Sequence, residues 1–268
     1  MYKMIAVDMD GTLLSKDKKI SKRTQAAIYK AMQKGIKIVL ATGRPLEGVS
    51  RYLEQLDLTK DDDYVISFNG CLVQNNKTKE VIKRSILKGE DLHRLYKLSK
   101  ELGVNIHAFT KEGCITPVMS KYSELEGTIN GIPVLVTDYE KIAKEEDIIK
   151  IMMVEEPEIL DRAIARLPKE IYEDYTVVKS APFFLEFLNK KANKGEGLRA
   201  LTKHLNIRMD ETIAIGDAGN DAHMIEYAGL GVAMANAFPE VKQISDYITA
   251  SNNDDGVAQV IEKFVLCE

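Results

Sequence analysis

Short apolar runs and amphipathic segments alternate through the first part of the chain. Residues 3–8 (KMIAVD), 36–41 (IKIVLA) and 64–69 (YVISFN) are rich in small and β-branched residues and have the length of buried strands. Residues 24–35 (TQAAIYKAMQKG) and 45–56 (PLEGVSRYLEQL), which lie between them, have the spacing of helices. Strands that alternate with helices form a parallel sheet covered by those helices. This part of the sequence therefore predicts a βαβαβ unit.

The same alternation returns near the end of the chain. Residues 212–216 (TIAIG) and 230–234 (LGVAM) are strand-like, and we expect helices at about 195–204, 220–228 and 256–264. We therefore predict an α/β fold in which both ends of the chain build one Rossmann-like, doubly wound parallel sheet.

The residues between these two halves follow a different pattern. Polar turn residues separate two β-rich arms at 73–82, which predicts a hairpin. Amphipathic helices are predicted at 90–102 and 157–167, and extended stretches at 148–154 and 183–188. This mixture of helices and strands is typical of an α+β domain.

The length of the chain also favours two domains. Its 268 residues exceed the about 100 to 150 residues of a typical domain. We therefore assign residues 1–84 and 190–268 to the sheet domain, and residues 85–189 to an inserted α+β domain.

Composition and charge argue against nucleic acid and membranes as partners and favour a small molecule. The net charge of −4 and the isoelectric point of about 5.8 give no basic field to attract nucleic acid or anionic lipid. The three cysteines are widely separated and form no C-x-x-C pair, which argues against a disulfide framework or a zinc site. Apolar runs are far shorter than the about 20 residues of a membrane span. We expect a cytoplasmic protein with a small-molecule partner; nothing in the sequence indicates its oligomeric state.

Polar residues follow several of the predicted parallel strands. Asp8 ends the first strand, Thr42 and Gly43 follow the second, Asn69 follows the third, and Asp217 follows the strand TIAIG. Ligands of open α/β sheets bind outside the carboxyl ends of the strands. The sequence therefore predicts one site at this edge of the sheet.

The residue types at this edge suit phosphate chemistry with Mg²⁺. Asp8 and Asp217 supply carboxylate oxygens, which Mg²⁺ prefers together with water and substrate phosphate. An ionised Asp8 can attack phosphorus and form an aspartyl-phosphate. Asp10 can protonate the leaving oxygen and later accept a proton from water. Gly11 allows the tight turn that this loop requires.

Phosphoryl transfer also needs hydrogen-bond donors and positive charge. Thr42 offers a hydroxyl group, and Lys194 offers a charge at the start of a predicted helix. Lys190 and Lys191 are competing candidates for the same role. Asn220 can donate to phosphate, and Asp221 can orient its neighbours.

Four segments, in this order, resemble the motifs of the haloacid dehalogenase superfamily of phosphatases. They are DMDGT at 8–12, ATGR at 41–44, the pair Lys194-Gly195, and GDAGND at 216–221. The insert lies between the second and third motifs, which resembles the Cof-type hydrolases with a C2-type cap. The segments ISFNG, IMMVEEPEILDRAIARLP and LGVAMANA make the chain most similar to the YidA-type sugar phosphatases, over essentially its whole length.

The resemblance implies a haloacid dehalogenase core, a cap domain and a set of site roles. Asp8 is then the nucleophile and a Mg²⁺ ligand. Asp10 is the acid/base and gives its backbone carbonyl to Mg²⁺, and Asp217 completes the protein ligands. The implied phosphoryl-binding groups are the main chain of Met9, Thr42, Gly43, Lys194 and Asn220. The supporting candidates are Arg44, Asn69 and Asp221. Arg44 either touches substrate or pairs with an acid. Asn69 either orients the Asp8 loop or closes a turn.

We therefore expect a Mg²⁺-dependent phosphatase, a phosphoric monoester hydrolase, that acts on small phosphorylated metabolites and on sugar phosphates in particular. Two alternatives stay open at this point. A phosphomutase would return the phosphoryl group to a sugar. A phospho-acceptor signalling module would also combine an Asp cluster with Thr and Lys, although such modules lack a large insert.

Overall fold

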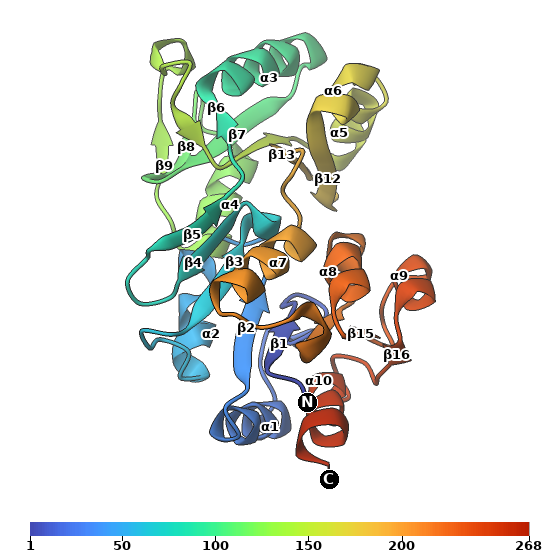
Figure 1. Cartoon of the computed structure of the whole chain (residues 1–268). Helices are drawn as coiled ribbons and strands as arrows, with labels where there is room; N and C mark the ends of the chain where they lie inside the picture. The colour runs from blue at the N-terminus through green and yellow to red at the C-terminus, as the bar shows by residue number, and fades with distance from the viewer. Residues whose placement is uncertain (268) are drawn as a thin grey trace. The chain divides into compact units, whose positions relative to one another are not determined.

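The computed structural model describes residues 1–267, which divide into two compact units. The first unit combines Met1–Arg84 with the chain from Asn193 onward, and the second is Ser85–Ala192. Figure 1 shows the first unit in blue to cyan and orange to red, and the second in green to yellow. Among residues 1–267 no helix is long and apolar enough to cross a membrane.

The first unit is built on an eight-stranded sheet with the order β16-β15-β14-β1-β2-β3-β4-β5 (Figure 1). Its strands are β1 (Met4–Val7), β2 (Lys37–Ala41), β3 (Tyr64–Ser67), β4 (Leu72–Asn75), β5 (Val81–Arg84), β14 (Thr212–Gly216), β15 (Leu230–Ala233) and β16 (Tyr247–Ile248). All pairs from β16 to β3 are parallel. The predicted hairpin forms β4 and β5, which add an antiparallel edge to this sheet.

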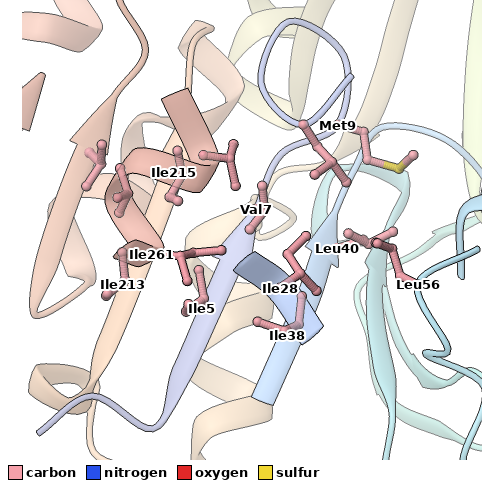
Figure 2. Packing of buried hydrophobic residues seen from close by; sticks show 14 of the residues in the cluster. Ile5, Val7, Met9, Ile28, Ile38, Leu40, Leu56, Ile213, Ile215 and Ile261 are labelled. Atoms are coloured by element: carbon pink, nitrogen blue, oxygen red, sulfur yellow. The ribbon is translucent and has the colours of Figure 1, made fainter. Parts of the chain in front are cut away.

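Helices cover both faces of this sheet. They are α1 (Lys22–Gln33), α2 (Ser50–Gln55), α7 (Lys194–His204), α8 (Ala222–Tyr227), α9 (Pro239–Ile244) and α10 (Gly256–Ile261). Because side chains alternate along a strand, Ile5 and Val7 pack on the face of α1 and α10, whereas Met4 and Ala6 pack on the face of α7 and α8. Figure 2 shows the first of these cores. The doubly wound parallel sheet predicted from the sequence is confirmed.

One predicted helix of the first unit differs from the structure. The pattern of residues 45–56 places Pro45 in the first turn, but the chain forms a short 3-10 turn at Glu47–Val49 and only then α2. Leu46 and Val49 are fully buried and belong to the same core cluster as Ile5 and Val7. Their packing fixes this segment, so the tertiary core determines where the helix begins.

The second unit is an α+β structure with a six-stranded sheet of order β12-β13-β11-β7-β8-β9. The strands are β7 (Asn105–Thr110), β8 (Gly113–Thr116), β9 (Val134–Val136), β11 (Lys150–Val154), β12 (Tyr175–Ala181) and β13 (Phe184–Asn189), and a separate pair joins β6 (Leu87–Lys88) to β10 (Asp147–Ile148). The helices are α3 (Gly89–Leu102), α4 (Lys121–Asn130), α5 (Pro157–Ile164) and α6 (Lys169–Asp174). Helices α3 and α5 cover one face and share its apolar core.

The other face of this sheet buries polar groups. Nζ of Lys150 lies 3.2 Å from Oε1 of Glu186, and Lys150 is 2% exposed. His107 is fully buried, and its Nδ1 lies 3.2 Å from Oγ of Ser123 on α4. Burial, with a smaller effect from Lys150, lowers the pKa of His107 to about 3. His107 is therefore neutral in the folded protein at ordinary pH.

Candidate active site

The predicted site residues converge at one edge of the first unit's sheet. Strands β14, β1, β2 and β3 are adjacent and parallel, so their carboxyl ends lie side by side. The chain order reverses at β1, since β2 lies on one side of it and β14 on the other. Asp8 follows β1, and its backbone N–H donates to the carbonyl of Ile215 on β14 at 2.9 Å. The fold therefore places Asp8 at a topological switch point, where α/β sheets bind ligands.

Asp8 is buried and pairs with the lysine of the third motif. It is 6% exposed, and its Oδ1 accepts from Nζ of Lys194 at 2.5 Å. Burial raises the pKa of Asp8 well above its usual range, and the charge of Asp221 adds to that rise, while Lys194 opposes it. The lysine is therefore the group that favours the ionised, nucleophilic form of Asp8.

Lys194 is the first residue of α7 and is completely buried. The side chain of Asn193 accepts from the N–H of Glu196 at 2.8 Å and so fixes where the helix starts. Nζ of Lys194 also donates to Oδ1 of Asp221 at 2.6 Å. Burial acts to lower the pKa of Lys194, but the two carboxylates outweigh it and the net shift is upward. Lys194 therefore stays charged.

The competing lysines lie in the second unit and have other surroundings. Lys191 is exposed, and Nζ of Lys190 donates to the carbonyl of Tyr172 at 2.6 Å. Among these three lysines, Lys194 is the one whose ammonium group contacts Asp8.

Asp217 is positioned by the Asp8 loop itself. Its Oδ1 accepts from the hydroxyl of Thr12 at 2.7 Å. Gly11 has φ of +93°, and a β-carbon there would overlap the carboxylate of Asp217. Glycine is therefore required at this position for conformation and for space. This role of Thr12 was not predicted, although its place in the motif DMDGT is a signal for it.

Asp221 is an internal support of the site. Its Oδ2 accepts from the N–H groups of Asp217 and Ala218, both at 3.0 Å, and its Oδ1 accepts from Lys194. It is 0% exposed. Three donors thus engage both oxygens, which is the environment of an orienting group.

The carboxylates fit a divalent cation. Asp8, Asp217 and Asp221 each offer an oxygen, and these atoms lie within 4.8 Å of one another. Because Asp221 is already engaged, Asp8 and Asp217 are the better ligands. Burial, followed in effect by the charge of Asp221, raises the pKa of Asp217 to about 6, although Thr12 opposes the rise. Mg²⁺ is a hard cation that prefers oxygen ligands, and its charge would offset the repulsion between these closely spaced carboxylates.

Asp10 lies apart from this cluster and is paired with cations. Arg44 donates from Nε and Nη2 to its two carboxylate oxygens at 2.8 and 2.7 Å, and Nζ of Lys18 donates at 2.6 Å. Burial acts to raise the pKa of Asp10, but these partners outweigh it and lower the pKa below its usual range. Of the two readings of Arg44, the structure shows the pairing with an acid. The contact of Lys18 was not predicted, because nothing in the sequence brings that exposed loop back to Asp10.

The predicted phosphoryl-binding groups surround the same edge. Met9 is fully buried and its side chain packs in the core of Figure 2, so that only its main chain remains for the site. Thr42 is 1% exposed, and its Oγ1 accepts from the N–H of Arg44 at 3.1 Å, which leaves its own proton for another acceptor. Gly43 lies against the side chain of Asn69. Nδ2 of Asn220 donates to Oδ1 of Asn69 at 2.9 Å.

The family model of the haloacid dehalogenase-like hydrolases matches residues 5–261. The chain therefore belongs to this family. The membership that the four motifs predicted is confirmed.

Relatives of this haloacid dehalogenase-like hydrolase match along its whole length. YxeH of Bacillus subtilis is 44% identical over 100% of both chains. YcsE of the same organism, named as a 5-amino-6-(5-phospho-D-ribitylamino)uracil phosphatase, is 32% identical over 98% of this chain and 96% of its own. 

Solved structures also match. A haloacid dehalogenase-like hydrolase from Bacteroides thetaiotaomicron has a TM-score of 0.87 and 32% identity, with 98% of this chain and 99% of that chain covered. BT4131, described as a subclass IIB sugar phosphatase of the superfamily, has a TM-score of 0.81 and 25% identity, with 98% of each chain covered.

Proposed function

We propose that the protein is a Mg²⁺-dependent phosphatase that hydrolyses phosphoric monoesters through an aspartyl-phosphate on Asp8. The observation that carries the proposal is the position of Lys194, whose buried ammonium group contacts both Asp8 and Asp221 beside Asp217. A fixed cation between carboxylates at a strand end favours the ionised form of the nucleophile and offers a positive charge to a phosphoryl oxygen.

The chain's own residues supply both steps of the hydrolysis. A carboxylate oxygen of Asp8 attacks phosphorus, the bond from phosphorus to the ester oxygen breaks, and Asp10 protonates the departing oxygen. Water then attacks the phosphorus of the aspartyl-phosphate, Asp10 accepts its proton, and phosphate and free Asp8 result. The phosphoryl oxygens are stabilised by the side chains of Thr42, Lys194 and Asn220 and by the main chain of Met9 and Gly43. Mg²⁺ would be held by Asp8, Asp217 and the backbone carbonyl of Asp10, and when bound it would neutralise charge on the phosphoryl group.

The pairing of Asp10 affects its protonation state in each step of the reaction. Its contacts with Arg44 and Lys18 favour the ionised carboxylate, which is the form that the second step needs. The first step needs the protonated form. We therefore propose that Asp10 leaves this pairing when substrate is bound, so that it can carry a proton to the ester oxygen.

We propose small phosphorylated metabolites, and sugar phosphates in particular, as the substrate class. The support is likeness to a described sugar phosphatase and to a phosphatase of a phosphoribityl compound. We propose the unit Ser85–Ala192 as the cap that selects the leaving group, because it is a compact insert of its own. We propose a cytoplasmic enzyme with a small-molecule substrate, and its negative net charge gives no field to attract nucleic acid or anionic lipid.

Replacing Asp8 with asparagine tests the proposal. We expect release of phosphate from p-nitrophenyl phosphate with Mg²⁺ to fall at least about a thousandfold, because an amide is a poor nucleophile. Asp17→Asn is the matched control, since Asp17 is exposed in the loop that follows the motif DMDGT, and it keeps full turnover. Unchanged turnover in Asp8→Asn contradicts the assignment. Product analysis with sugar phosphates separates the alternatives, since a phosphomutase yields an isomeric sugar phosphate instead of free phosphate.

A further inference from the structure

The turn that follows β3 has an unusual backbone. Phe68, Asn69 and Gly70 have φ angles of 50°, 55° and 88°. Asparagine and glycine tolerate this left-handed region, but a bulky residue such as phenylalanine is rarely found there. Such strain persists only where surrounding contacts determine the conformation, and it concentrates at functional sites. The contacts of this turn therefore indicate which parts of the site the strained backbone holds in place.

The turn is bonded to the loop that carries Thr42. The N–H of Asn69 donates to the carbonyl of Thr42 at 2.9 Å, and the N–H of Phe68 donates to the carbonyl of Arg44 at 3.1 Å. A β-carbon on Gly43 would lie 3.2 Å from Oδ1 of Asn69, so this side chain packs directly on the loop. The left-handed turn thus holds both ends of the Thr42–Arg44 segment.

The same turn reaches the loop after β14. Oδ1 of Asn69 accepts from Nδ2 of Asn220 at 2.9 Å, and Asn69 is only 4% exposed. An amide group has two N–H bonds. Asn69 engages one of them, so the orientation of the Asn220 amide is fixed and its other N–H is left for a ligand.

The third contact of the turn is with the start of α7. A β-carbon on Gly70 would overlap the carbonyl of Asn193 and would lie 3.1 Å from the backbone nitrogen of Lys194. Asn193 is the residue that caps this helix. The three residues of the turn therefore touch three separate segments of the site, which carry Thr42, Asn220 and Lys194.

We propose that Asn69 is a positioning residue, which sets Thr42 and Asn220 for the phosphoryl group through the left-handed turn. The inference rests on the proposed function and extends it, because Asn69 itself touches no reacting atom. The backbone of the turn fixes the Thr42 loop, and the side-chain amide of Asn69 fixes Asn220. Removal of the side chain alone should therefore weaken phosphate binding without unfolding the protein.

The variant Asn69→Gly tests this role, because glycine accepts the left-handed backbone and lacks the Oδ1 acceptor. Asn206→Gly is the matched control, since Asn206 has φ of 54° and is exposed outside the site. We expect kcat/KM to fall about 10- to 100-fold in Asn69→Gly, as for other residues that orient direct ligands. The calorimetric Kd for inorganic phosphate with Mg²⁺ rises in the same variant. Both variants should stay folded and unfold in a single cooperative transition.

A double-mutant cycle with Asn220→Ala separates positioning from a general structural effect. If Asn69 acts through Asn220, the loss in the double variant is smaller than the product of the two single losses. Losses that multiply fully, or an Asn69→Gly enzyme within twofold of wild type in kcat/KM and in phosphate affinity, overturn the inference. If instead the wild-type protein hydrolyses no ester, the proposed function fails, while phosphate calorimetry still tests Asn69.

Discussion

Replacing Lys194 with methionine tests whether its ammonium group holds the site together. Nζ lies 2.5 Å from Oδ1 of Asp8 and 2.6 Å from Oδ1 of Asp221, and Lys194 is fully buried. Methionine keeps an unbranched chain but leaves two buried carboxylates without their cation. Breaking a buried ion pair from one side costs about 3–5 kcal/mol, whereas an exposed pair contributes only about 0–1 kcal/mol. We therefore expect the free energy of unfolding to fall by about 3–5 kcal/mol.

Urea unfolding of the full chain measures this loss, with Lys191→Met as the matched control because Lys191 is exposed. The dependence on pH adds a second signature. Burial already raises the pKa of Asp8 while Lys194 opposes the rise, so loss of the lysine raises that pKa further. A carboxyl group with a raised pKa binds more protons in the folded than in the unfolded state, and its cost is relieved as pH falls. The variant should therefore regain part of its stability as the pH falls.

Equal losses of unfolding free energy in Lys194→Met and Lys191→Met would contradict this role of the ammonium group. A loss in Lys194→Met that does not shrink on acidification would also contradict it. Turnover of p-nitrophenyl phosphate provides an independent check. Lys194→Met should be nearly inactive, because Asp8 loses the charge that favours its ionised form. Lys191→Met should match the wild-type rate.

Three further predictions concern the proposed metal site, the pairing of Asp10 with Arg44, and the second unit. Gly11→Ala places a methyl group against the carboxylate of Asp217, a proposed Mg²⁺ ligand, so the Mg²⁺ concentration for half-maximal rate should rise more than about tenfold. The control Gly35→Ala has φ of +80° with nothing within 4 Å of the added β-carbon, and it should leave this concentration unchanged. Arg44→Ala removes the two hydrogen bonds that lower the pKa of Asp10 in the free enzyme, so the pH profile of kcat/KM should move to higher pH, and an unmoved profile contradicts this role of Arg44. The pKa of about 3 for His107 means that protonation on acidification favours the unfolded state. Between pH 7 and 5 this should cost about 2 kcal/mol in wild type, and His107→Gln should lack that part of the slope in urea unfolding.

The strands and the carboxyl edge of the sheet could be predicted because local pattern determines them. Buried parallel strands are continuous apolar runs, and the polar residue that ends each run, such as Asp8 or Asp217, is visible in the sequence. Strand adjacency then brings these ends together. The predicted pattern failed at Pro45, where burial of Leu46 and Val49 sets the local conformation.

The contacts that organise the site depend on tertiary structure and have no local signal. The ion pair of Lys18 with Asp10 depends on how the loop after β1 folds back on itself, and the hydrogen bond of Asn69 with Asn220 joins two separate loops. The left-handed conformation of Phe68 could not be predicted either, because phenylalanine disfavours it and only the surrounding loops impose it.

Mass spectrometry of the acid-quenched enzyme during turnover identifies the residue that carries the phosphoryl group. The protein is mixed with p-nitrophenyl phosphate and Mg²⁺, quenched in acid, and digested, and the phosphorylated peptide is sequenced. The account predicts a phosphoryl group on the side chain of Asp8, absent in Asp8→Asn and present in Asp17→Asn. A phosphoryl group on any other residue, or turnover by Asp8→Asn at the wild-type rate, would contradict it.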